Sequence, residues 1–411
     1  TIHVFILFNL IIPFFVFYLT DKIMLLRPGG HGDSELLERN PLYHKYKSNT
    51  PYAKAFILTL PLFILGFLPL IFGYTDIPIA MGLERDYTFA ELGLTFLGTE
   101  QLFGFISSSS GTTGPFGIGA LMFSMLIPIS IALFFSMAFK EKTEELILER
   151  EKTKELESEF NNSLFQLGNR IGNGIPPEIA FGKTAESSKG LKTEDFFKRV
   201  NYNIRQGGMS VESAIFDRSR GALVYYPSEL ISTSMKILVE SAKKGLKIAA
   251  LSLMSISEYV KNIQKINLRL KDMLAEIISD MRSNMTFLAP LLLGVVVGLA
   301  AMITAILSKL NLSDLGSSAA PGNLQQFLNI FDLTQMIPPY YLQLIIGIYL
   351  IQMVYILSGT LVTIESGENK LERTHNAGKN FTRGVFLYFI VAAVSVLALF
   401  FLASIVLGNI I

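Results

Sequence analysis

The chain contains no cysteine, which excludes disulfides, thiolate zinc sites, iron–sulfur clusters and cysteine nucleophiles. It has only four histidines, far apart and without HxxxH or HxH spacing, so we expect no metal site. Charged residues are also scarce, at 17% against about 25% in an average soluble domain, whereas 50% of the residues are hydrophobic. The formal net charge of +1 provides no basic field for nucleic acid. These deficits argue against a soluble enzyme and against a nucleic-acid-binding protein.

Six apolar segments are long enough to cross a bilayer, whose hydrocarbon core of about 30 Å needs about 20 helical residues. None of them contains Asp, Glu, Lys or Arg, although ion-coupled transporters and proton relays normally carry such groups inside their spans. We therefore predict an all-α polytopic membrane protein with six transmembrane helices. The predicted spans are residues 2 to 19, 55 to 73, 117 to 139, 287 to 307, 340 to 362 and 385 to 407.

Lys and Arg are unevenly distributed among the loops between these spans. Of the 35 basic residues, 33 lie in the loops 20 to 54, 140 to 286 and 363 to 384. The loops 74 to 116 and 308 to 339 contain the other two. Because cytoplasmic loops accumulate Lys and Arg, we predict that the first three loops are cytoplasmic and the last two external, in a multi-pass protein of the cell membrane.

Residues 140 to 286 make the one polar segment long enough to form a domain. A run rich in Glu and Lys, without Gly or Pro, extends from 139 to 160 and predicts that the third span continues as a helical stalk. That stalk is either a solvated helix or a coiled-coil arm against a second copy. Beyond it, Gly174 and Gly208 each end one helix shortly before another begins, which predicts two helical hairpins.

A single long helix is expected from about 228 to 281, because its apolar residues recur at spacings of three and four and form a core-facing stripe. The chain then divides into an N-terminal membrane region over 1 to 139, a cytoplasmic stalk and helical-bundle domain over 140 to 286, and a C-terminal membrane region over 287 to 411. The stripe comprises Met235, Leu238, Ala242, Leu246, Ala249, Leu253, Ile256, Val260 and Ile263.

No segment has a pattern typical of catalysis. Gly182, Lys183 and Thr184 look like the end of a GxxxxGK[ST] phosphate-binding loop. The position of the first glycine, however, is Pro177, which has no N–H to offer a phosphate. No GxSxG, HExxH or paired-carboxylate pattern has a supporting context. We expect neither an enzymatic activity nor a cofactor.

Four short motifs follow one another in the predicted cytoplasmic region. They are LFQLGNRIGNGIP at 164 to 176, IRQGGMS at 204 to 210, YP at 226 to 227 and ESAKKGL at 240 to 246. Over about residues 155 to 310, their order and their junction with the fourth span resemble the type II secretion system F domain. That family comprises the platform proteins of type IV pilus, type II secretion and archaellum machines. Six spans and a charged stalk are more similar to its archaeal branch, and above all to archaellum platform proteins.

The resemblance implies a non-enzymatic membrane anchor on which a hexameric cytoplasmic secretion ATPase docks. The anchor would couple ATPase motion to the insertion of pilin-like or archaellin subunits. Archaeal members tend to have two copies of the domain, so the resemblance also implies a first copy and one further span ahead of residue 1. A polytopic transporter or passive channel is the alternative. The candidate ATPase-facing residues are basic side chains near the predicted hairpin tips: Lys198, Arg199, Arg205, Arg218 and Arg220.

Small residues recur on one face of the fourth span. Gly294 and Gly298 form a GxxxG pattern, which Ala301 and Ala305 extend. Small residues allow helix backbones to approach closely in lipid. This face predicts either a homodimer contact or packing between the spans of one chain.

Overall fold

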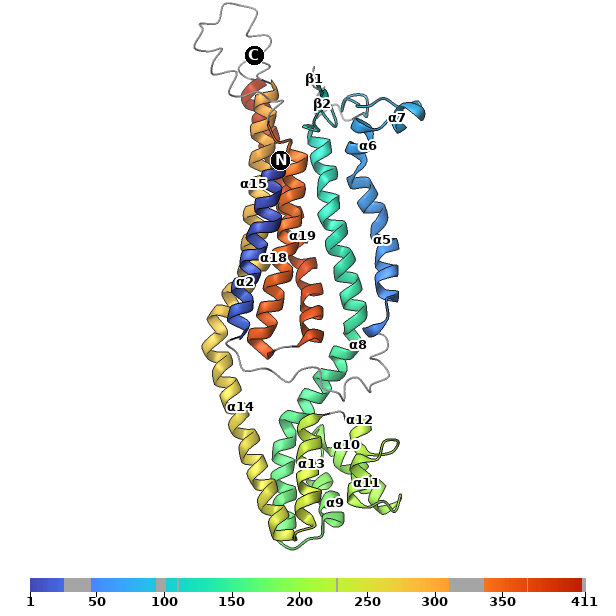
Figure 1. Ribbon diagram of the computed structural model, residues 1–411, viewed down its shortest axis with the longest axis vertical. Helices are drawn as coiled ribbons and strands as arrows, with labels where there is room; N and C mark the ends of the chain where they lie inside the picture. The colour runs from blue at the N-terminus through green and yellow to red at the C-terminus, as the bar shows by residue number, and fades with distance from the viewer. Residues whose placement is uncertain are drawn as a thin grey trace, which may run out of the picture.

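The computed structural model is a long molecule with two helical parts arranged end to end, an upper bundle and a lower body (Figure 1). The described residues are almost entirely α-helical, which confirms the predicted all-α class; β1 (Ile106–Ser108) and β2 (Gly111–Thr113) form a short antiparallel pair. The described residues are 1–25, 46–93, 101–108, 111–226, 228–309, 336–367 and 369–408. Much of the predicted loops 20 to 54 and 308 to 339, and Pro227 of the YP motif, therefore lie outside the described residues.

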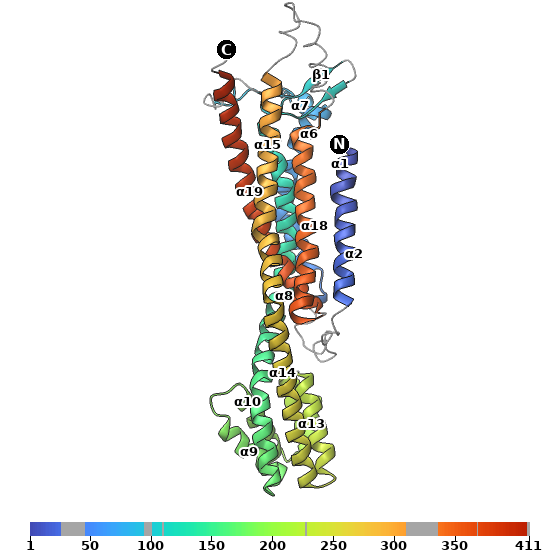
Figure 2. The same cartoon turned by 90° about the vertical axis from the view of Figure 1, so that its left-hand side faces the viewer.

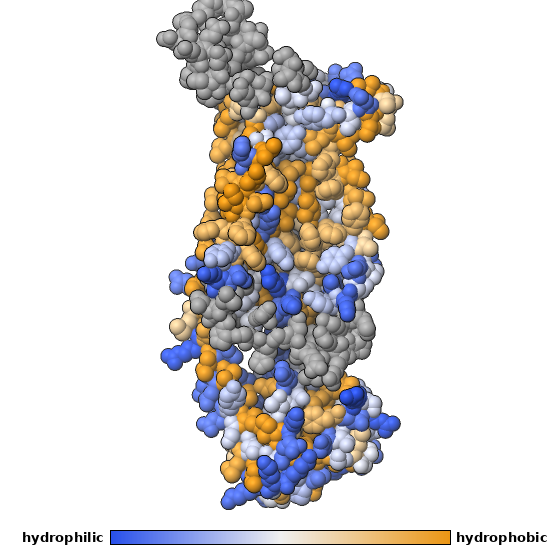
Figure 3. Space-filling view, viewed as in Figure 1, coloured by the Kyte–Doolittle hydropathy of each residue, from blue (hydrophilic) through white to orange (hydrophobic). Residues whose placement is uncertain are grey.

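The upper bundle contains the long apolar helices. Five helices of the described chain are long and apolar enough to cross a membrane, and α5 with α6 makes a sixth if this bent pair is one span. Apolar side chains dominate the surface of the bundle (Figure 3), so the chain fits a multi-pass membrane protein. The bundle elements are α1 (Ile2–Ile6), η1 (Leu7–Ile11), α2 (Ile12–Leu25), α5 (Thr50–Gly66), α6 (Leu68–Tyr74), α7 (Ile77–Ala80), the first half of α8 (Ile118–Gly172), η3 (Asn284–Leu288), α15 (Ala289–Lys309), α18 (Pro339–Ser366) and α19 (Lys370–Gly408).

The predicted span at 55 to 73 is bent rather than straight. Helices α5 and α6 meet at Phe67 at an angle of 45°. Pro69 lies in the first turn of α6, where its missing N–H is tolerated, although the same residue could not continue the hydrogen-bond ladder of α5. Just before the bend, Gly66 lies so close to α8 that an added Cβ would be 2.4 Å from Ile127 Cγ1. The bend therefore accompanies close packing of α5 on α8.

Helix α8 runs without interruption through 55 residues, from the upper bundle into the lower body (Figure 1). The predicted continuation of the third span as a helical stalk is thus confirmed. The charged segment after Phe139 contains good helix formers and no helix breaker, so nothing in the sequence ends the helix before Gly172. Gly174, with φ of +83°, then reverses the chain toward α9.

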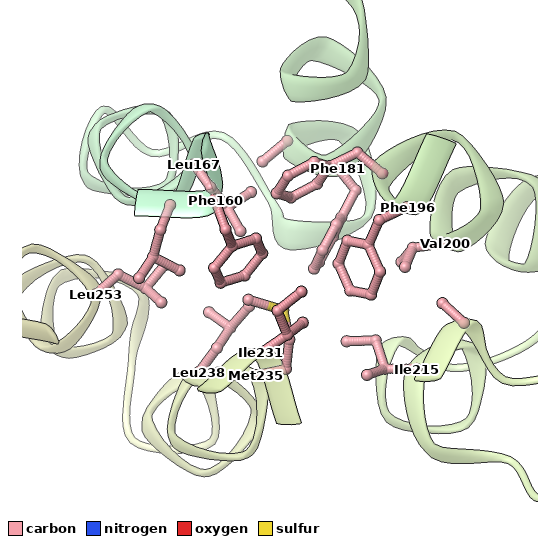
Figure 4. Close-up of a cluster of buried hydrophobic side chains, with 14 of the residues drawn as sticks. Phe160, Leu167, Phe181, Phe196, Val200, Ile215, Ile231, Met235, Leu238 and Leu253 are labelled. Carbon is pink, nitrogen blue, oxygen red and sulfur yellow. The ribbon is translucent and has the colours of Figure 1, made fainter. Parts of the chain in front are cut away.

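The lower body is a set of short helices packed on the end of α8. Phe160, Phe181 and Phe196 lie together at its centre (Figure 4). The ring of Phe197 contacts all three, and the four side chains are fully buried. Each predicted glycine separates two helices: Gly174 lies between α8 and α9, and Gly208, with φ of +62°, lies between α10 and α11. Ser210 accepts a hydrogen bond from Ser213 N at the start of α11. The body elements are α9 (Pro177–Ser187), α10 (Thr193–Arg205), α11 (Val211–Phe216), α12 (Ala222–Tyr225), α13 (Glu229–Ala242) and the first half of α14 (Leu246–Ser283).

The predicted single helix from 228 to 281 is wrong. The structure divides it into α13 and α14, which lie side by side in a hairpin (Figure 2). The break is at Gly245, whose φ of +126° only glycine adopts readily. Ala242 and Leu246, on either side of the turn, both pack against the body core. The apolar spacing therefore continues across the turn, and periodicity alone cannot distinguish one helix from two.

Candidate functional site

The five predicted basic residues lie in two neighbouring segments of the body. Lys198, Arg199 and Arg205 are on α10, and Arg218 and Arg220 are in the turn between α11 and α12. Four of the five are exposed, whereas Arg199 is half-buried. The structure therefore brings together residues that are up to 22 positions apart in the chain.

Asn203 holds these two segments together. Its side-chain Nδ2 donates to the carbonyl oxygen of Ala214 at 3.1 Å and to that of Arg220 at 2.8 Å. Asn203 is itself buried, and its bond to Ala214 O is shielded from water, whereas its bond to Arg220 O is partly shielded. One amide thus fixes the position of the α11–α12 turn relative to α10.

The α11–α12 turn is also ordered from within. Asp217 Oδ1 accepts hydrogen bonds of 2.8 Å from the backbone N–H groups of Ser219 and Arg220 and from the Ser219 hydroxyl. These donors hold the pKa of the Asp217 carboxyl below its usual value. These hydrogen bonds therefore fix the backbone conformation of the turn that carries Arg218 and Arg220.

Aromatic side chains lie among the basic ones. The Arg199 guanidinium lies 4.2 Å from the centre of the Tyr225 ring, and its Nε is buried without a hydrogen-bond partner among the described residues. Tyr225 is 53% exposed and Tyr202, one turn of α10 beyond Lys198, is 55% exposed. We call this patch the α10–α12 surface; it consists of Lys198, Arg199, Tyr202, Arg205, Arg218, Arg220, Val224 and Tyr225.

The sequence reasoning missed Tyr202, Val224 and Tyr225. Exposed Tyr beside Arg is the composition that protein interfaces favour at the contacts that contribute most affinity. The spacing from Lys198 to Tyr202 was a usable signal, because residues four apart share a face of a helix. The contact between Arg199 and Tyr225 had no such signal, since it depends on how α12 folds back on α10.

The basic residues of the α10–α12 surface differ in their electrostatics. Lys198 Nζ lies 2.6 Å from Glu194 Oε1, and this hydrogen bond is the main cause of the lowered pKa of Glu194. Arg205, Arg218 and Arg220 form no ion pair within the described part of the chain. Their charges are thus available to an acidic partner.

The small-residue face of the fourth span is occupied by another helix of the same chain. An added Cβ on Gly294 would lie 2.9 Å from Ala392 N, and one on Gly298 would lie 2.6 Å from Ser395 Cβ, both on α19. Ala301 is buried in the bundle core and Ala305 is half-buried. Of the two interpretations of this face, the geometry matches packing within one chain, because α19 leaves no room for a second copy there.

Two helices join the body to the bundle, and they are attached differently. On α8, Thr143 Oγ1 donates to Phe139 O and shares a hydrogen bond of 2.9 Å with the ring nitrogen Nδ1 of His375 on α19. Further along α8, Arg150 bonds Asn369 and Lys154 bonds Glu372. On α14, Arg282 forms an ion pair of 2.6 Å with Glu365 at the end of α18. Helix α8 therefore contacts the lower end of the bundle at three positions over several helical turns, whereas α14 is joined to it by the ion pair at Arg282.

The segment that looks like a phosphate-binding loop is part of helix α9. Thr184 Oγ1 donates to Ala180 O, and Gly182 packs against Asn201, so neither residue faces an open loop. Within the described ranges, no group of three or more His, Asp or Glu side chains could hold a metal ion. Comparison of the chain with protein-family models, with curated proteins and with solved structures found no match.

Proposed function

We propose that this chain is the integral-membrane platform protein of an archaellum or type IV pilus-like filament assembly machine. In this role the α10–α12 surface docks a hexameric cytoplasmic secretion ATPase, and the chain transmits the motion of the ATPase to the insertion of pilin-like or archaellin subunits. The resemblance of the four motifs to the F domain family supports the proposal, as does the exposed Arg and Tyr surface.

The observation that carries the proposal is the continuity between body and bundle. Helix α8 spans 55 residues, and α14, η3 and α15 together make a second continuous helix of 62 residues from Leu246 to Leu307. A continuous helix moves as a rigid element, so displacement of the body reaches the apolar helices directly. A passive channel has no need of such a connection.

The proposal also assigns sides of the membrane. The polar loops 20 to 54, 140 to 286 and 363 to 384 face the cytoplasm, and 74 to 116 and 308 to 339 face the outside. Because the chain has no cysteine, single-cysteine variants test this cleanly. A membrane-impermeant maleimide should label Glu84→Cys in intact cells and Ser219→Cys only after lysis. The opposite pattern would reverse the assignment.

The decisive experiment is a pull-down of the secretion ATPase from the same cells by the full chain in detergent. The triple variant Arg205→Glu, Arg218→Glu and Arg220→Glu should lose the ATPase. The matched control makes the same charge change at three exposed basic residues of α14: Lys261→Glu, Lys265→Glu and Arg269→Glu. It should retain the ATPase. Equal retention by both variants would reject the α10–α12 surface as the docking site, and absence of any binding by the unaltered chain would favour flux assays for the transporter alternative.

A further inference from the structure

A short segment after the bent α5–α6 pair carries exposed apolar side chains. Helix α7 projects sideways at the end of the bundle opposite the body (Figure 1), and apolar side chains lie on that projection (Figure 3). From Ile77 to Leu83, every second residue is large, apolar and exposed, and Met81 is 72% exposed. We call these residues the α7 segment: Ile77, Ile79, Met81 and Leu83.

Hydrogen bonds hold the backbone of the α7 segment in a closed loop. Leu83 N donates to Pro78 O at 2.8 Å, and Met81 N donates to Ile77 O at 3.1 Å. Across the ends of the segment, Arg85 forms an ion pair of 2.8 Å with Asp76. The exposure of the apolar side chains is therefore a property of a defined loop.

Asp86 fastens this loop to the two neighbouring helices. Its Oδ1 accepts a hydrogen bond of 2.9 Å from Phe103 N, and its Oδ2 accepts one of 2.8 Å from Gly104 N. The buried Phe103 ring in turn contacts Phe72 on α6 and Phe123 on α8, at 5.5 and 6.2 Å between ring centres. The loop is thus positioned by the ends of both helices.

The α7 segment lies at the level where the apolar helices α6 and α8 end. Helix α6 ends at Tyr74, whose hydroxyl donates to Gly114 O at 3.0 Å, shortly before α8 begins at Ile118. Tyr74 is half exposed, and tyrosine is enriched where membrane helices leave the hydrocarbon core. The boundary between lipid and water therefore passes beside the α7 segment.

We propose that the α7 segment inserts into the bilayer interface on the side opposite the body, where lipid covers its apolar side chains. Interfacial segments of this kind reach about 5–10 Å into the boundary between headgroups and acyl chains. The exposed charges beside the segment are Asp76, Glu84 and Arg85, two carboxylates and one guanidinium. Apolar contact, and no attraction to anionic lipid, therefore holds the segment in place.

The composition of the segment favours lipid over a protein partner. Protein interfaces concentrate their affinity in Trp, Tyr and Arg, and residues 77 to 83 contain none of these three. Lipid, in contrast, already surrounds the adjoining apolar helices. The contact holds the end of the bent α5–α6 pair at a fixed depth in the membrane. It does not depend on ATPase docking.

Tryptophan fluorescence tests the proposal, because the chain contains no tryptophan. The single variant Met81→Trp is placed in phosphatidylcholine vesicles whose acyl chains carry bromine, which quenches tryptophan. Ile57→Trp, on α5 and likewise 72% exposed, is the lipid-facing control, and Glu84→Trp is the control at an exposed charged position of the loop. With a depth of about 5–10 Å, Met81→Trp should be quenched at least about threefold more than Glu84→Trp and about as strongly as Ile57→Trp.

Iodide in the water phase provides the second measurement. Met81→Trp should be protected from iodide, whereas Glu84→Trp should be quenched by it. Quenching of Met81→Trp by iodide and not by brominated lipid would place the segment in water. Quenching by neither would mean that a protein, either a second copy or another partner, covers the segment. Each of these two results would overturn the proposal.

A further variant tests whether the apolar side chains themselves hold the segment at the interface. Adding Ile77→Asp and Ile79→Asp to Met81→Trp should reduce quenching by brominated lipid to the level of Glu84→Trp. Thermal unfolding in detergent checks that the triple variant is folded. Unchanged lipid quenching in the folded triple variant would contradict the proposal, because the depth of the loop would then be set by α6 and α8 alone.

Discussion

The side-chain amide of Asn203 donates a 2.8 Å hydrogen bond to the backbone carbonyl of Arg220 and thereby joins α10 to the α11–α12 turn. The same Nδ2 group also bonds Ala214 O, so one buried residue satisfies two carbonyls that no helix ladder reaches. Asn203 therefore holds the two segments of the α10–α12 surface together, although its own side chain is buried and is not part of that surface.

Replacement of Asn203 should disassemble the surface without changing its charge. Asn203→Ala leaves the buried carbonyl of Ala214 and the partly buried carbonyl of Arg220 without a donor, which costs about 1–3 kcal/mol in the free energy of unfolding. We expect a lower Tm in detergent and loss of ATPase retention in the pull-down. Asn262→Ala, at an exposed position of α14, is the control and should change neither. A full Tm for Asn203→Ala would show that the two bonds contribute nothing.

Gly298 should tolerate no side chain, since an added Cβ lies 2.6 Å from Ser395 Cβ and 2.9 Å from Ser395 C. Gly298→Leu must therefore separate α15 from α19, at a cost of about 1–3 kcal/mol or more. The measurement is thermal unfolding in detergent together with the mass of the protein–detergent particle. Val296→Leu, on an exposed face of the same helix, is the matched control. A drop in oligomer mass with unchanged Tm would instead support a homodimer contact at the face that contains Gly294 and Gly298.

Gly245→Ala should weaken the hairpin of α13 and α14. A residue with a Cβ at φ of +126° is strained by about 1–3 kcal/mol, although nothing within 4 Å would obstruct the new methyl group. The expected result is a lower Tm and faster amide exchange on both sides of the turn. Lys244→Ala changes the neighbouring exposed residue and serves as control. An unchanged Tm would mean that the turn relaxes to another conformation freely.

The α11–α12 turn should loosen in acid. The folded-state pKa of Asp217 is lowered by hydrogen bonds from the Ser219 backbone N–H and hydroxyl and from the Arg220 N–H. Its stabilising contribution is therefore complete above the unfolded-state pKa of about 3.9 and is lost as the pH falls through the lower folded-state value. Exchange of the Ser219 and Arg220 amides, corrected for intrinsic rates, should accelerate in that range. In Asp217→Asn this acid-dependent step should disappear; its persistence would assign the step to another group.

The sequence predicted those features that depend on local composition. The long uncharged runs place the helices of the bundle, the Glu- and Lys-rich run keeps α8 unbroken past Phe139, and Gly174 and Gly208 end helices as expected. Each of these signals is contained within one segment and needs no knowledge of what packs against it.

The features that were missed depend on contacts between segments. The turn at Gly245 is hidden because α13 and α14 bury their apolar faces in the same core, so the spacing continues through it. The bend at Phe67 accompanies close packing of α5 on α8, and the stacking of Arg199 on Tyr225 requires α12 to fold back on α10. Local patterns in a single sequence do not show which distant segments pack against each other, so these three features could not be predicted.

The unbroken helix α8 also acts as a spacer. If the third span ends at Phe139, the first buried residue of the body core, Leu156, lies about 25 Å further along the helix axis. A protein docked on the body would therefore be held clear of the lipid headgroups by a fixed distance. Lengthening α8 and α14 together by two whole turns would raise that clearance by about 11 Å while preserving the facing of the body, whereas an insertion of two residues in α8 alone would rotate its two ends by about 200° relative to each other and put α8 out of register with α14. The matched lengths of the two continuous helices thus set both the height and the orientation of the body relative to the bundle.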